Sequence, residues 1–362
     1  MTTNSAVTRE QLLALPKVVL HDHLDGGLRP QTIIDLAAEI GHVLPHDTAT
    51  ELGAWFVAAA DSGSLERYLE TFEHTVAVMQ TRHGLIRVAQ EMVADMAADG
   101  VIYAESRWAP EQHVAGGLTM QQAVDAVQEG IAAGVAQAAA DGHFIEVHQI
   151  LAAMRHLDRW EEVSDLALAN RERGVCGFDI AGPEVGFLPD RFAQVWQKLA
   201  LANFPVTIHA GEEPGIDSIG RAVHVGQASR LGHGAYLSAD ITGLGTQDAR
   251  LGPLANWVRD AQLPLEVCPC SNLQTGVAAT IAEHPITALR DLDFAVTINT
   301  DNRLMSGTSM TNEMFRLVSE AGWTVADLCD VTLAAAWGAF IHHDQRHALG
   351  QRILAGFEQD SN

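Results

Sequence analysis

The sequence predicts an α/β fold, a (β/α)8 barrel of the TIM type with extra helices between its first and second strands that cover the C-terminal mouth. Short apolar runs alternate along the chain with longer Ala-rich stretches of helical periodicity, which is typical of parallel strands joined by crossover helices. Several runs also end in polar residues, namely His21, His23, His209, His233 and Asp301. Because the C-terminal strand ends of a barrel form a single mouth, these distant residues are expected to share one site.

Eight runs qualify as strands, which is the number that closes such a barrel. In chain order they span residues 18–21, 101–105, 144–150, 177–180, 206–209, 229–233, 265–268 and 294–299. The chain length of 362 residues suits one barrel with insertions better than two unrelated domains. We therefore expect a single barrel domain over residues 1–362.

The segment between the first two strands, residues 28–100, is longer than one crossover helix needs. Insertions after the C-terminal end of a strand lie on the active-site side, so we expect helices over the barrel mouth. Ser64 is expected to cap the helix that carries Tyr68, Leu69 and Phe72, whose spacing makes an apolar face. Taken alone, that face is compatible with ordinary packing.

Composition excludes several classes of partner. The chain has 46 acidic against 22 basic side chains, a formal net charge of −24, which repels phosphate polymers and anionic membranes. No run approaches the roughly 20 apolar residues of a membrane span, and the N-terminus does not have the pattern of a secretory signal. We expect a cytoplasmic protein with a small-molecule substrate, no nucleic-acid partner and no membrane partner, and the oligomeric state stays open.

The four cysteines are too sparse for a disulfide framework, and we expect reduced thiols. Cys268 and Cys270 are expected to alternate across a strand, so at most one of them faces the site. We interpret them as small buried hydrophobes in preference to zinc ligands.

The pattern of histidines predicts a metal site. Side chains alternate along an extended backbone, so His21 and His23 reach the same ion while Asp22 points away. His209 and Asp301 supply two further ligands, and this set suits zinc with one position left open for water. Such a metal lowers the pKa of bound water to about 7. Neither of the two lysines, Lys17 and Lys198, ends a middle strand to bridge a second metal, so one ion per chain is favoured.

Three residues near the expected metal predict the chemistry. Glu212 lies three positions after His209, on the loop that leaves the same strand. A carboxyl group in a dry pocket has a raised pKa and serves as a general acid near neutrality. His233, between two glycines, is placed to orient the attacking water or to accept its proton. Gly182 would let the backbone approach a ligand, although a role in the turn alone is the alternative.

A more specific pattern runs through nearly the whole chain in a fixed order. It comprises residues 17–30 (K-V-V-L-H-D-H-L-D-G-G-L-R-P), 64–72, 154–156 (M-R-H), 177–184, 207–212 (T-I-H-A-G-E), 231–234 (L-G-H-G), 268–272 (C-P-C-S-N) and 299–301 (N-T-D). In these segments the chain resembles the adenosine/AMP deaminase family of the metal-dependent amidohydrolase superfamily, and adenosine deaminases in particular.

The resemblance implies zinc-dependent hydrolysis of adenosine and 2′-deoxyadenosine to inosine and 2′-deoxyinosine plus ammonia, a reaction of purine salvage. It implies one Zn²⁺ per chain, held by His21, His23, His209 and Asp301. Glu212 would donate a proton to purine N1, His233 would assist the attacking water, and Asp301 would also belong to the catalytic set. The substrate contacts it implies are His23 again, Asp25 at the ribose 5′ end, Gly182 through its backbone, and the pocket walls Tyr68, Leu69 and Phe72. Arg107 and Arg155 also match family positions, and we expect structural ion pairing from both.

One position departs from the family pattern. Asn302 follows the metal-binding aspartate where better-known members carry a second aspartate facing the purine. An Asn amide still donates to purine N7, so catalysis is expected to survive, while base selectivity and the pH profile stay open.

Several alternatives remain open. AMP would need a cationic pocket for its phosphate, whereas Asp25 would face that phosphate with like charge. Free adenine and 5′-modified adenine nucleosides are harder to exclude because the same metal chemistry serves them. The cytidine deaminase signature fails, because Leu273 stands where its second cysteine is required. A catalytically inactive nucleoside-binding protein is the alternative of another class, and the presence of the whole proposed catalytic set argues against it.

Overall fold

The computed structural model describes residues 7–359, and it confirms the α/β barrel class. Eight parallel strands line its centre: β1 (Lys17–His23), β2 (Val101–Trp108), β3 (Glu146–Met154), β4 (Val175–Ala181), β5 (Thr207–Ala210), β6 (Arg230–His233), β9 (Leu265–Val267) and β10 (Val296–Ile298). They form two four-stranded halves, in the orders β1-β2-β3-β4 and β10-β9-β6-β5. Parallel bridges join the edges of the halves, Asp22 to Asp301 and Phe178 to Val206.

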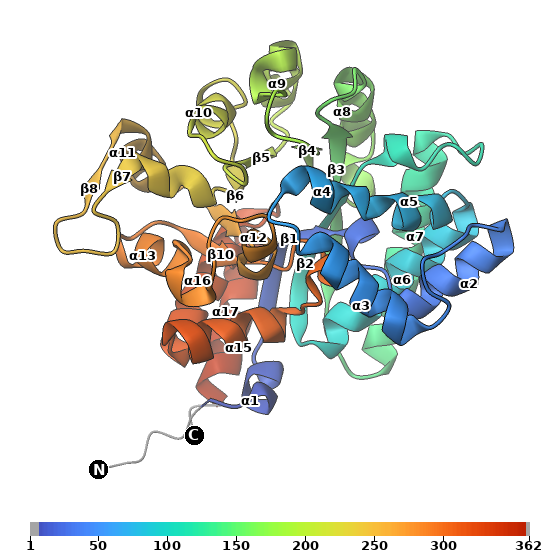
Figure 1. Cartoon of the computed structure of the whole chain (residues 1–362), viewed down its shortest axis with the longest axis horizontal. Coiled ribbons are helices and arrows are strands. Elements are labelled where there is room, and N and C mark those ends of the chain that lie inside the picture. The colour runs from blue at the N-terminus through green and yellow to red at the C-terminus, as the bar shows by residue number, and fades with distance from the viewer. Residues whose placement is uncertain (1–6, 360–362) are drawn as a thin grey trace.

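The inserted segment forms helices, as predicted. They are α2 (Pro30–Ile40), α3 (Ala49–Ala60), α4 (Leu65–Glu70), α5 (Phe72–Val78) and α6 (Arg82–Ala98). Figure 1 shows the helices arranged around the central strands, with α3 and α4 crossing in front of them.

The other helices connect the strands or follow the last strand, except that α1 precedes β1. They are α1 (Arg9–Ala14), α7 (Met120–Ala140), α8 (Trp160–Ala169), α9 (Ala193–Leu201), α10 (Asp217–His224), α11 (Pro253–Asp260), α12 (Pro269–Gln274), α13 (Ile286–Asp291), α14 (Arg303–Ser306), α15 (Met310–Ala321), α16 (Val325–Gly338) and α17 (His343–Gln359). Short 3₁₀ helices lie at Leu24–Gly26, Pro110–Gln112, Arg171–Arg173, Pro189–Phe192, Ala235–Asp240 and Ile281–Glu283. A small antiparallel pair, β7 (Ile241–Thr242) and β8 (Arg250–Leu251), stands apart from the barrel. Within residues 7–359, none of the helices has the length and apolar character to cross a bilayer.

Two predicted details of the strands are wrong. Phe144 lies outside β3, which begins at Glu146 and continues to Met154, and the Phe144 side chain is exposed. Cys268 and Cys270 do not alternate across a strand, because Cys268 is the N-cap residue of α12 and Cys270 lies inside that helix. Pro269 explains the change of backbone. Its fixed φ and missing N–H suit the first position of a helix.

The helix over the mouth is shorter than predicted. The Ser64 hydroxyl caps α4 by accepting a hydrogen bond from Arg67 N at 3.5 Å. The helix ends at Glu70, and the hydroxyl of Thr71 donates to Tyr68 O at 2.7 Å. Phe72 therefore belongs to the next helix, α5. The apolar face predicted for one helix is shared by two.

Candidate active site

A cavity of about 700 Å³ opens at the C-terminal ends of the strands. It brings together every residue predicted for the site except His21, which is fully buried next to the rings of His23 and His209. The predicted residues that line it are His23, Asp25, Tyr68, Leu69, Phe72, Gly182, His209, Glu212, His233, Asp301 and Asn302. A pocket with apolar walls and a few convergent polar groups is the usual form of a small-molecule site.

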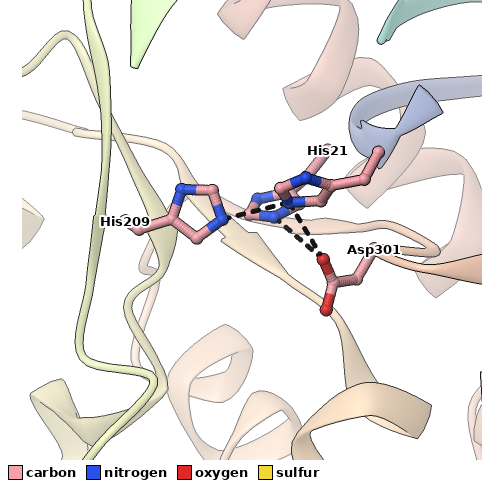
Figure 2. A group of neighbouring side chains, drawn as sticks. His21, His209 and Asp301 are labelled. Atoms are coloured by element: carbon pink, nitrogen blue, oxygen red, sulfur yellow. Dashed lines mark hydrogen bonds and ion pairs between the residues drawn. The ribbon is translucent and has the colours of Figure 1, made fainter. Parts of the chain in front are cut away.

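Four of these residues form a cluster of potential metal ligands. His21 and His23 end β1, and each places its Nε2 atom 3.3 Å from Oδ1 of Asp301. The Nε2 atoms of His23 and His209 are 3.2 Å apart, and one potential ligand atom from each of the four residues lies within 4.8 Å of the others. Figure 2 shows His21, His209 and Asp301 directed toward one point. As predicted, Asp22 points away from this cluster, since its carboxylate accepts hydrogen bonds from Thr300 and Arg303.

The cluster fits a metal ion. Nε2 of His21 is buried and has no hydrogen-bond partner among the described residues. Buried polar groups are rarely left unpaired in folded proteins. Three imidazole nitrogens and one carboxylate are the donor set of a catalytic zinc site with an open position.

Two buried carboxylates contact the Nδ1 atoms of His21 and His209. Glu266 Oε2 lies 3.0 Å from Nδ1 of His21, and Asp179 Oδ2 lies 2.8 Å from Nδ1 of His209. A carboxylate at Nδ1 keeps the proton there and leaves the Nε2 lone pair free to bind a metal. Arg107 joins the two supports, with its Nη1 2.6 Å from Asp179 Oδ2 and its Nη2 2.6 Å from Glu266 Oε2. Neither carboxylate was predicted from the sequence.

The expected ion pairing of Arg107 is thus confirmed. Arg155 is different. It is fully buried and donates a hydrogen bond from Nη2 to the carbonyl oxygen of His209 at 2.5 Å. Among the described residues it forms no ion pair.

Burial alone would raise the pKa of Glu266, but the guanidinium groups of Arg107 and Arg230 outweigh it and hold that pKa well below its usual range. Glu266 therefore stays ionised inside the barrel. Replacing it by Gln removes one of the two carboxylates that pair with each arginine, so that only Asp179 remains beside Arg107 and only Glu105 beside Arg230. We expect Glu266→Gln to lower the free energy of unfolding by about 3–5 kcal/mol, measured by urea denaturation.

The control for this prediction is an exposed ion pair, Arg159 with Glu162 on α8. Because exposed pairs contribute little, Glu162→Gln should cost no more than about 1 kcal/mol. Equal effects of the two substitutions would contradict a structural role for the buried network.

The two remaining catalytic candidates face each other beside the cluster. Glu212 Oε2 lies 3.6 Å from Nε2 of His233. Burial, followed by the charge of Asp301, raises the pKa of Glu212 well above its ordinary value, which favours the protonated carboxyl group. Burial also holds the pKa of His233 well below its usual range, so its imidazole is neutral.

The loop that carries Glu212 is held in place by hydrogen bonds to the Glu184 carboxylate. Glu184, on the loop after β4, accepts hydrogen bonds from the backbone N–H groups of Gly211, Glu212 and Glu213 at 2.7, 3.1 and 2.9 Å. Glu213 in turn accepts from the backbone of Glu184 and Val185, each at 2.9 Å. These bonds tie the Glu213 carboxylate to the neighbouring loop, although the residue also borders the cavity.

The residues predicted to contact a substrate line the rest of the cavity. Asp25 is buried beside two histidines, with its carboxylate oxygens 3.9 Å from Nδ1 of His23 and 3.6 Å from Nε2 of His113. Gly182 has φ +102°, a backbone conformation that residues with a side chain rarely adopt. Asn302 is buried, and its Oδ1 has no partner among the described residues.

The structure adds polar residues that the sequence left without a role. Ser271 donates to Asp301 Oδ2 at 2.6 Å, and Asn272 contacts His233 Nδ1 at 3.0 Å. Both belong to the C-P-C-S-N segment. The sequence signal for this arrangement is Pro269, because a proline suits the first position of a helix, and the helix that begins there carries both Ser271 and Asn272.

Comparison with known proteins agrees with this geometry. A family model described as adenosine deaminase matches residues 16–355. Adenosine deaminase 1 of Streptomyces coelicolor is 52% identical over 346 residues, covering 95% of this chain and 87% of the relative. The adenosine deaminase of Mycobacteroides abscessus is 51% identical over 340 residues, 94% of each chain. A crystal structure of an amidohydrolase from Burkholderia ambifaria with bound Zn is similar with a TM-score of 0.83 and 25% identity, covering 99% of this chain and 96% of that one.

Proposed function

This chain belongs to the adenosine deaminase family, and from that membership we propose how its residues divide the family reaction among themselves. The enzyme hydrolyses the 6-amino group of adenosine, giving inosine and ammonia, and accepts 2′-deoxyadenosine in the same way. The observation that carries the proposal is one cavity containing four potential metal ligands, with Glu212 and His233 beside them.

The metal is zinc, one ion per chain, held by His21, His23, His209 and Asp301. Bound there, zinc lowers the pKa of a coordinated water to about 7 and supplies the nucleophile for C6. Two features support zinc: the donor set of three imidazoles and a carboxylate, and the bound Zn of the related amidohydrolase.

Removal and return of the metal tests this assignment. After chelation, deaminase activity should fall to background, and titration with Zn²⁺ should restore it with a plateau near one equivalent per chain. Metal content is measured alongside activity at each step. Full activity in the metal-free protein, or a plateau near two equivalents, would contradict a single zinc.

The chain's own residues supply the proton and the orientation of the reactants. Glu212, protonated in its dry environment, donates to purine N1 as the nucleophile adds to C6. His233 assists the attacking water. Asp25 binds the ribose 5′ hydroxyl and disfavours a 5′ phosphate by like charge, while the backbone of Gly182 bonds the purine. Tyr68, Leu69 and Phe72 exclude water from the cavity.

Asn302 is the residue that contacts purine N7, through its amide donor. Asn302→Ala should lower kcat/KM for adenosine about tenfold to a hundredfold, the effect of leaving a buried acceptor unpaired. The matched control changes the substrate and not the protein. 7-Deazaadenosine has no N7 acceptor, so the substitution should change its kcat/KM little. Equal losses with both substrates would refute the contact.

The cavity walls also suit a second substrate class. Its walls between β2 and β4 carry small or apolar side chains, Ala109, Ala152 and Ala181 among them. These walls would accommodate an apolar 5′ substituent, so 5′-modified adenine nucleosides remain the second candidate.

A further inference from the structure

A series of hydrogen bonds between buried side chains leads from the backbone to Nδ1 of His233, the ring nitrogen on the side away from Glu212. Nδ1 of His233 lies 3.0 Å from Nδ2 of Asn272. Oδ1 of Asn272 lies 3.3 Å from Nε2 of His284. Nδ1 of His284 accepts a hydrogen bond from the backbone N–H of Ile286 at 3.1 Å.

The direction of this chain is determined at its backbone end. A backbone N–H is always a donor, so Nδ1 of His284 must carry the lone pair. Burial lowers the pKa of His284 to about 3, so the ring is neutral and its proton is on Nε2. That proton is donated to Oδ1 of Asn272. The amide group of Asn272 must then donate from Nδ2 to His233.

The proton of His233 is thereby placed as well. Since Nδ1 of His233 accepts from Asn272, the neutral ring carries its hydrogen on Nε2, the atom 3.6 Å from Glu212 Oε2. Nε2 is buried and has no hydrogen-bond partner among the described residues. An unpaired buried donor directed at a reaction site is what a positioned water or oxyanion requires.

We propose that His284 and Asn272 are positioning residues that hold His233 as the Nε2–H tautomer, so that His233 donates a hydrogen bond to the attacking oxygen and does not accept its proton. This inference rests on the proposed function and decides between the two roles that the sequence left open for His233. The imidazole keeps its proton throughout. The attacking water would lose its proton to solvent on binding to the metal, because the metal would lower the pKa of that water to about 7, and the proton delivered to N1 comes from Glu212.

All three side chains in this hydrogen-bond series are shielded from solvent. His233, Asn272 and His284 have exposed fractions of 0, 0 and 2%. Water therefore does not compete for these hydrogen bonds. A change in one member is transmitted to the next, because each group has one partner fixed by the group before it.

The tautomer itself is the first readout. In the zinc-loaded enzyme labelled with ¹⁵N-histidine, a long-range ¹H–¹⁵N correlation spectrum distinguishes a protonated from an unprotonated ring nitrogen, and His233→Gln identifies the signal. We expect a protonated Nε2 and an unprotonated Nδ1 at His233. This spectrum does not depend on turnover, so it remains decisive if the proposed reaction fails. A protonated Nδ1 would overturn the inference.

The second test reverses the direction of the hydrogen bond between residue 272 and His233. Asn272→Asp replaces the amide donor by an acceptor, which favours Nδ1–H on His233 and removes the donor from Nε2. We expect the tautomer signal to invert and kcat to fall by about 10²–10⁴-fold with little change in KM, since a wrong tautomer has an effect of this size in a serine protease triad. Full kcat with an inverted signal would show that the donor at Nε2 is not used, and would overturn the inference.

Two further variants guard against a general loss of structure. Asn256→Asp is the matched control, because Asn256 donates to the backbone of Leu251 and Gly252 away from the cavity. It should leave kcat and the His233 signal unchanged. His284→Ala keeps Asn272 but removes its orientation, so both tautomers of His233 should be detected and kcat should fall about tenfold. If Asn272→Asp fails to fold, an unchanged His233 signal in His284→Ala would refute the chain.

Discussion

Glu212→Gln should lower kcat for adenosine by about 10²–10⁴-fold, the usual contribution of a general acid. Gln has nearly the same shape as a protonated Glu and occupies the same site, but its amide has no acidic proton to give to purine N1. Metal content and the melting temperature should stay close to those of the parent enzyme, because Glu212 is not among the four potential ligands that surround one point. Steady-state kinetics with adenosine measures the effect.

Glu213→Gln is the matched control for this prediction. Glu213 is the neighbouring carboxylate on the same loop, and its Oε2 accepts from two backbone N–H groups. Its loss should cost less than about tenfold, because it loosens the loop without removing the proton donor. If the two substitutions lowered kcat equally, the assignment of the acid to Glu212 would be wrong.

His209→Ala should remove the metal and nearly all activity. The imidazole of His209 supplies one of the four potential ligand atoms that lie within 4.8 Å of each other. Its Nδ1 contacts Asp179, so the substitution also leaves that buried carboxylate without one partner. A catalytic metal contributes several kcal/mol to the barrier, so kcat should fall at least about 10³-fold. Elemental analysis should show less than one metal ion per chain.

The control is His343→Ala, at an exposed histidine on α17. It should bind the metal and turn over adenosine like the parent enzyme. A His209→Ala protein that kept one metal ion and full kcat would contradict the ligand set.

Much of this site could be predicted because it lies at strand ends. The alternation of side chains in an extended backbone put His21 and His23 on one side and Asp22 on the other, and the structure has this arrangement. The convergence of His209 and Asp301 on the same point follows from the parallel order of the strands. These are consequences of local geometry and topology, which a single sequence carries.

The supporting residues could not be predicted in the same way. Glu266 and Asp179 lie within strands, and nothing in their own neighbourhood shows that Arg107 reaches both. Their roles depend on which inward positions share a layer of the barrel, and therefore on strand register. Similarly, Cys268 and Cys270 were expected to alternate across a strand, whereas the structure places Cys270 and Asn272 together in a short helix that begins at Pro269.

The break between α4 and α5 has a related cause. The apolar spacing of Tyr68, Leu69 and Phe72 is correct for a helix, and all three residues line the cavity. The sequence pattern does not show that the hydroxyl of Thr71 contacts the backbone at the junction, so one continuous helix was predicted where the chain forms two.

The most direct test of the whole account is ultraviolet absorbance of the zinc-loaded protein with adenosine, 2′-deoxyadenosine, adenine and AMP in parallel. The change of a 6-amino purine into its 6-oxo form is followed in each sample. The account predicts rapid conversion of the two nucleosides, with adenine and AMP left nearly unchanged. Conversion of adenine or AMP without conversion of the nucleosides would contradict it.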